Sequence, residues 1–156
     1  MMNWFQIIRK DETKLNEALE FYLKEYEEAK KEVNVKSYVK MSDAIAAISS
    51  NFEHRLDQYS DLESIYQFYD NKYKKLRGAL TQKIISNSPK AINSTDMKAF
   101  IDANEVVAEY VDTLLLIDSV RKKYEGLSKA FDVLNWQMSN LVKLQIAGLD
   151  GALVPT

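Results

Sequence analysis

Apolar residues recur at every seventh position through the middle of the chain, and this spacing constrains the fold more than any other feature. Six residues hold the repeating position and four hold the interleaved one: Ile45, Phe52, Tyr59, Tyr66, Tyr73 and Leu80, then Ile48, Leu62, Tyr69 and Leu76. This spacing is typical of a long helix with an apolar seam, meaning a stripe of apolar side chains along one face. We predict a helix from about residue 43 to 86, N-capped by Ser42 or Asp43. Arg55 and Lys83 are the polar exceptions in the seam.

A second helical pattern follows a polar break at residues 86–95, where Pro89 disfavours helix at the preceding residue. Thr95 or Asp96 is the predicted N-cap, and the helix is expected to continue to Gly148. The apolar positions along it are Phe100, Ala103, Val107, Tyr110, Leu114, Ile117, Val120, Tyr124, Leu127, Phe131, Leu134, Met138 and Leu141. Gly126, which costs about 1 kcal/mol in a helix interior, suggests either a bend or a close crossing.

The first part of the chain predicts a shorter helix from about residue 12 to 33. Ahead of it, the apolar residues 4–8 could dock on another subunit or cap the chain's own core. Only four glycines and two prolines occur in 156 residues, which favours long helices. The predicted fold class is therefore all-α: an elongated hairpin of two long helices plus a shorter N-terminal helix. Its expected divisions are an acidic segment 1–41, the hairpin 42–148 and a tail 149–156.

The apolar faces are too broad for two rods to cover by packing on each other alone. Residues 106–120 are apolar nearly all round, and such a helix needs neighbours on more than one side. We therefore expect a homo-oligomer assembled through apolar seams. The predicted oligomerisation residues are Tyr110, Leu114, Ile117, Phe131, Leu134, Trp136 and Met138.

Charge is unevenly distributed although the formal net charge is only −2. Residues 11–32 hold eight acids and four bases, whereas residues 66–90 hold six bases and one acid. The basic segment also carries aromatic rings, and cations with exposed rings can bind single-stranded nucleic acid. The candidate DNA-binding residues are Phe68, Lys72, Lys74, Lys75, Arg77 and Lys83. The alternative is a solvated face beside ordinary core rings, and a second basic cluster at 121–123 is expected to lie roughly opposite residue 60.

We find no pattern that predicts an enzyme, and we expect no cofactor. His54 is the single histidine and cysteine is absent, which disfavours a metal site or thiol chemistry. The four glycines are too dispersed for a phosphate-binding loop. We identify neither a secretory signal nor an apolar run long enough to span a membrane, so we expect a cytoplasmic protein, in the host cytoplasm if it is viral.

Four features in order resemble the UvsY family of phage recombination mediators, over roughly residues 55–148. They are the basic aromatic segment Tyr69–Arg77, the polar break, the stretch TDMKAFIDANEVV, and the pattern from Leu127 to Met138. The resemblance implies an oligomeric all-α ring that binds single-stranded DNA, a single-strand-binding protein and a recombinase. It also implies DNA contacts by Lys72, Lys74, Lys75 and Arg77, and an oligomerising role for Trp136. Leu134 and Asn135, which replace the arginine common before that aromatic, and the negative net charge depart from the family pattern.

Two hypotheses about function follow. The first is a recombination mediator that helps load a recombinase onto protein-covered single strands. The second is a non-enzymatic structural or adaptor protein, such as a phage virion or scaffold component, that works through helix-mediated oligomerisation.

Overall fold

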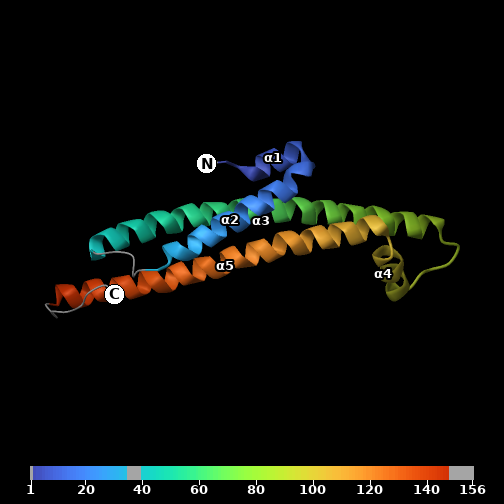
Figure 1. Ribbon diagram of the computed structural model, residues 1–156. Coiled ribbons are helices and arrows are strands. Elements are labelled where there is room, and N and C mark those ends of the chain that lie inside the picture. The colour runs from blue at the N-terminus through green and yellow to red at the C-terminus, as the bar shows by residue number, and fades with distance from the viewer. Residues whose placement is uncertain (1, 35–39, 148–156) are drawn as a thin grey trace.

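The computed structural model describes residues 2–34 and 40–147, and every regular element in these ranges is helical (Figure 1). The all-α prediction is therefore confirmed. The elements are α1 (Trp4–Lys10), a short 3-10 turn η1 (Glu12–Lys14), α2 (Leu15–Glu32), α3 (Met41–Asn87), α4 (Ser94–Asp102) and α5 (Glu105–Ile146). The predicted tail 149–156 and Gly148 lie outside the described residues.

The two longest helices, α3 and α5, lie side by side and run in opposite directions (Figure 1). The Phe52 ring packs at a tilt against the Phe131 ring with centroids 5.5 Å apart, and Arg121 donates to Glu63 at 2.9 Å. A later residue of α3 thus contacts an earlier residue of α5, so the two helices are antiparallel. The contact of Arg121 with Glu63 also agrees with the expectation that residue 121 lies near residue 60.

The helices α1 and α2 cover a second side of this pair, with α2 lying obliquely against both α3 and α5 (Figure 1). Trp4 and Ile8 of α1 are 5% and 0% exposed and belong to the same core as α3 and α5. Of the two interpretations of residues 4–8, the structure therefore supports the cap on the chain's own core.

Packing on two sides moves the buried face of α3 away from the predicted centre of the seam. Ile48, Leu62 and Tyr69 of the interleaved positions are buried, as predicted, but the every-seventh residues such as Tyr59 are only half-buried. Ile65 lies outside both predicted rows and is fully buried. The core therefore follows the side of α3 that faces both α5 and α2.

The predicted start of the first long helix needs correction. The helix α3 begins at Met41 with Lys40 at the cap position, and no side-chain cap hydrogen bond is made there. Ser42 and Asp43 lie within the first turn of the helix and are not its N-cap. The predicted C-terminal end near residue 86 agrees with the observed end at Asn87.

The prediction of one continuous second helix was wrong, because the chain forms two helices, α4 and α5. The Asn104 side chain accepts hydrogen bonds from the backbone N–H groups of Val106 and Val107, at 3.0 and 3.2 Å. These bonds N-cap a new helix after Ala103, although Ala103 fits the apolar spacing. The N-cap of α4 is Asn93 and neither Thr95 nor Asp96, because the Asn93 side chain accepts from the backbone N–H of Asp96 at 2.8 Å.

The helix α5 continues unbroken through Gly126. A Cβ atom added to Gly126 would have no neighbour within 4 Å. No other helix in the described ranges of the chain therefore crosses closely at Gly126.

Candidate interaction surfaces

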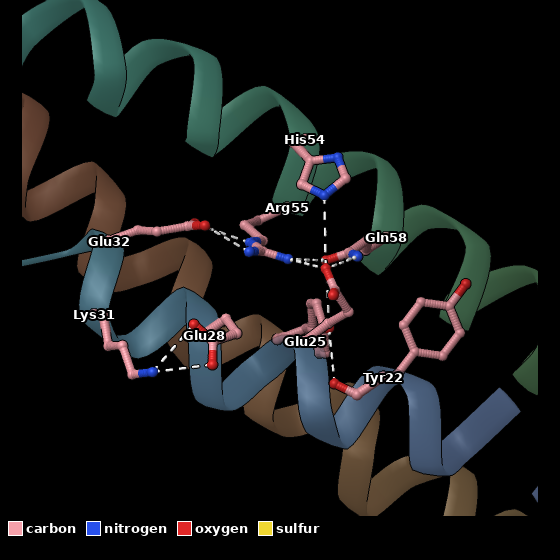
Figure 2. A network of polar contacts seen from close by, with 9 residues as sticks. Tyr22, Glu25, Glu28, Lys31, Glu32, His54, Arg55 and Gln58 are labelled. Carbon is pink, nitrogen blue, oxygen red and sulfur yellow. Dashed lines mark hydrogen bonds and ion pairs between the residues drawn. The ribbon is translucent and has the colours of Figure 1, made fainter. Parts of the chain in front are cut away.

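A polar cluster joins α2 to α3 and explains why Arg55 interrupts the apolar seam (Figure 2). The Arg55 guanidinium donates to Glu25 at 2.8 Å and to Glu32 at 2.6 Å. The Gln58 side chain accepts from Arg55 at 2.8 Å and donates to Glu25 at 3.0 Å. Because the Arg55 side chain is only 6% exposed, these carboxylates are needed to compensate its lost hydration.

The electrostatics of this cluster suit a structural role. Burial raises the pKa of Glu25, but hydrogen bonds from Arg55 and Gln58 outweigh burial and hold that pKa below its ordinary value. His54 lies at the edge of the cluster, 44% exposed, with Nε2 3.8 Å from a Glu25 oxygen. Within residues 2–34 and 40–147, no group of three or more His, Cys, Asp or Glu side chains is placed to hold a metal ion.

A second buried polar contact fastens α1 to α3. The Asp61 carboxylate accepts hydrogen bonds from the backbone N–H groups of Trp4 at 3.0 Å and Phe5 at 3.3 Å, which are free donors in the first turn of α1. The Tyr22 hydroxyl also donates to Asp61. Burial, followed by this hydrogen bond, raises the pKa of Tyr22 above its ordinary range. Asp61 thus holds α1 and α2 on one point of α3.

The five predicted DNA-binding cations fall into two groups. Three have carboxylate partners in the same chain: Lys72 with Glu12, Lys74 with Asp70 at 2.6 Å, and Arg77 with Asp102 at 2.9 Å. Arg77 also donates to the Tyr73 hydroxyl at 2.9 Å. Lys75 and Lys83 are exposed and have no partner among the residues that the structure describes.

Acids from the facing helices offset the basic charge of this segment. A surface hollow is lined by Arg77 and Lys98 together with Asp102 and Asp112. Residues 96–112 contribute five acids and one base, whereas residues 66–90 contribute one acid and six bases. The sequence shows the basic run but not the acids that folding brings beside it, so the local field is weaker than the run alone suggests.

Phe68 was predicted as a platform for a base, but its ring already has neighbours. It packs edge-on against Phe5 at 6.2 Å and against Tyr69 at 5.3 Å, measured between ring centroids. The Lys72 ammonium lies 4.7 Å from the centre of the ring. Phe68 is half-buried, and a stacked base would have to displace part of this packing.

Most of the predicted oligomerisation residues lie in the chain's own core. Those buried are Leu114, Ile117, Phe131, Leu134 and Met138, with exposures from 0% to 9%. Tyr110 is half-buried against the same core. Trp136, by contrast, is 67% exposed.

Trp136 belongs to an exposed apolar surface on α5 that the sequence analysis did not assign. Eight of the thirteen large apolar side chains that are exposed among the described residues lie on this helix: Val106, Val111, Leu115, Leu116, Val133, Trp136, Leu144 and Ile146. We define the outer face of α5 as Val111, Leu115, Val133, Trp136 and Leu144, which fall within about 80° of one another at 3.6 residues per turn. The all-round apolar character of residues 106–120 was a signal for Val111 and Leu115 only.

Comparisons with protein families, curated proteins and solved structures find no match. In the described ranges, no helix is long and apolar enough to cross a membrane.

Proposed function

We propose that this chain is a non-enzymatic structural or adaptor protein that assembles with copies of itself through the outer face of α5. The observation that carries the proposal is the exposure of large apolar side chains on a helix whose opposite face is already buried. Leu115 and Val133 are 62% and 57% exposed, and Trp136 is 67% exposed. Large apolar side chains gathered on one exposed side of a helix mark an interaction site, because their exposure to water is unfavourable.

The proposed assembly uses the α3–α5 hairpin as a rigid support. The core side of α5 holds this helix against α3 and α2, so its outer face stays presented along the molecule. In this proposal, the seam that unites copies is the outer face, and the buried residues such as Phe131 act indirectly by keeping α5 in place.

Sedimentation velocity across a concentration series tests this proposal. We expect self-association of the unmodified chain, and a large loss of it in the Leu115→Glu and Trp136→Glu variants, because a charge would be desolvated in the interface. Leu23→Glu is the matched control, since Leu23 is an exposed leucine on α2 outside the outer face. A monomer at all concentrations would refute the proposal.

A second candidate function is the single-stranded DNA mediator, and the arrangement of three lysines on α3 favours it, of which Lys75 and Lys83 are unpaired among the described residues and Lys72 pairs with Glu12. Lys72, Lys75 and Lys83 fall within about 80° of one another around α3, at 3.6 residues per turn. Such a row can neutralise successive phosphates, and copies in an assembly would add their contacts. In this case the partners would include a recombinase and a single-strand-binding protein.

A titration of a labelled single strand at several salt concentrations distinguishes the two functions. The mediator function predicts binding that weakens steeply with salt and is reduced in a Lys75→Glu, Lys83→Glu double variant. Lys14→Glu with Lys31→Glu is the control, because it makes the same change in net charge on other elements. Absence of binding at low salt would leave the assembly function alone.

A further inference from the structure

The first residues of the chain lie along the side of α3 that carries the lysine row. At 3.6 residues per turn, five residues fall within about 80° of one another around this helix: Asp61, Phe68, Lys72, Lys75 and Lys83. The helix α1 packs on α3 (Figure 1), and η1 follows α1 in the chain. We call α1 and η1, residues 4–14, the N-terminal cover.

The N-terminal cover contacts the two groups at the start of this row. The Phe5 ring of α1 packs edge-on against the Phe68 ring, with centroids 6.2 Å apart. The Glu12 carboxylate of η1 pairs with the Lys72 ammonium, which itself lies 4.7 Å from the centre of the Phe68 ring. A single strand binds a protein through the same two kinds of contact, a base on an aromatic ring and a phosphate on a cation. Phe5 and Glu12 therefore occupy the positions that a base and a phosphate would need.

The N-terminal cover acts through these two contacts and not through its net charge. Residues 4–14 hold three bases and two acids, so the segment as a whole does not neutralise the row. Lys75 and Lys83 lie further along α3 and are exposed. The docked cover thus leaves part of the row open to phosphates but withholds Phe68 and Lys72.

The way in which the N-terminal cover is attached gives it two states. Its helix α1 has seven residues, too few for a stable isolated helix in water. The Asp61 carboxylate, which accepts from the backbone N–H groups of Trp4 and Phe5, holds it on α3 together with the burial of Trp4 and Ile8. Release from α3 and loss of the α1 helix are therefore coupled, so the segment is either docked or open.

We infer that the N-terminal cover is an autoinhibitory segment that closes the single-strand-binding site of α3 by placing Phe5 on Phe68 and Glu12 on Lys72. The inference rests on the second candidate function, since it names the regulation of the same row of residues. A bound single strand and the docked cover compete for Phe68 and Lys72. Binding of a strand therefore opens the cover, and a change that loosens the cover strengthens binding.

A substitution without a charge change tests the competition. Phe5→Ala uncovers Phe68 and weakens the docking of α1, so the dissociation constant for a labelled oligothymidylate strand should fall about 5- to 150-fold, the factor that one base stacked on an aromatic ring contributes. Phe100→Ala is the matched control, because Phe100 is a 61% exposed phenylalanine on a different element, α4. The control should bind the strand as the unmodified chain does.

A second substitution tests the ion pair. Glu12→Gln frees Lys72 for a phosphate, so the plot of log affinity against log salt concentration should steepen by about 0.7, the value of one added phosphate contact on a single strand. Glu20→Gln is the control, because it makes the same charge change at an exposed glutamate of α2 and should leave the slope unchanged.

Hydrogen exchange shows whether strand binding opens the N-terminal cover. The backbone N–H groups of Trp4 and Phe5 are bonded to Asp61, so residues 4–10 of the unmodified chain should exchange faster when a saturating strand is bound. A strand that lies beside a docked cover leaves this exchange unchanged or slows it, and that result overturns the inference.

The outcomes separate this inference from the function on which it rests. If neither the unmodified chain nor Phe5→Ala binds the strand at low salt, the mediator function and the inhibitory role of the cover are both refuted. If the unmodified chain binds the strand and Phe5→Ala binds it with the same affinity, the inhibitory role is refuted and the mediator function stands.

Discussion

Removing the Asp61 carboxylate should release α1 from α3. In Asp61→Ala the Tyr22 hydroxyl loses its hydrogen-bond acceptor. Tyr22 is only 1% exposed, and a buried hydroxyl without a hydrogen-bond partner costs about 1–3 kcal/mol. The first turn of α1 loses its cross-helix acceptor for Trp4 and Phe5, which is comparable to losing an N-cap and costs about 1 kcal/mol. We therefore expect the free energy of unfolding to fall by about 2–4 kcal/mol.

Tryptophan fluorescence can follow α1 directly. The chain has two tryptophans, so in a Trp136→Phe background the remaining Trp4 reports on α1 alone. Trp4 is 5% exposed, and its emission should shift to longer wavelength when Asp61→Ala is introduced. Urea unfolding in the same background gives the change in stability.

The control for this prediction is Asp57→Ala, which removes an exposed aspartate one turn earlier on α3. It should change the free energy of unfolding by less than about 0.5 kcal/mol, as is usual for a surface site. If Asp61→Ala behaves like Asp57→Ala in both measurements, Asp61 does not hold α1 in place and the reasoning fails.

Three further predictions concern stability. Arg55→Met should lower the free energy of unfolding by about 2–3 kcal/mol in chemical denaturation, less than breaking a fully buried pair, because Glu25 and Glu32 reach water. Since Arg55 lowers the pKa of Glu25, the stability from this pair is present above the ordinary pKa of 4.5 and is lost as pH falls. The variant should therefore lose less stability than the unmodified chain on acidification, and equal acid sensitivity of the two would contradict the assignment. Asn104→Ala should cost about 1 kcal/mol by removing the N-cap of α5, and an unchanged thermal midpoint would show that the cap is dispensable. Phe131→Ala should cost about 3–5 kcal/mol in urea unfolding, because the side chain is 0% exposed and packs against Phe52, and a loss below about 1 kcal/mol would indicate a poorly packed core.

The sequence predicted the long helices because their apolar spacing is a local property. The bounds of α3 follow from a run of apolar positions that ends before Pro89, and both signals can be read without knowledge of the fold. The boundary between α4 and α5 was missed for a related reason. Ala103 satisfies the apolar spacing, so the pattern continues across the point where α4 ends and the Asn104 side chain caps α5.

The surfaces were harder to predict because they depend on which helix covers which face. Residues 106–120 are apolar nearly all round, and the sequence alone cannot tell that Leu114 turns inward while Leu115 stays 62% exposed. The partners of the basic segment were equally hidden. Arg77 meets Asp102 only because α4 folds back on α3, so a charge count along the chain overstates the free cations.

The hydrogen bond between the Tyr124 hydroxyl and the backbone carbonyl of Tyr22, 2.9 Å long, has a consequence for synthesis on the ribosome. Its two residues are 102 positions apart, so at about 5–20 residues per second the contact site for α2 is translated some 5–20 s after α2 itself. During this interval α1 and α2 can pack on α3, but the side of α2 that contacts α5 has no partner. Nascent chains should therefore depend on chaperones early, and slower translation between the codons for Tyr22 and Tyr124 should lengthen that dependence.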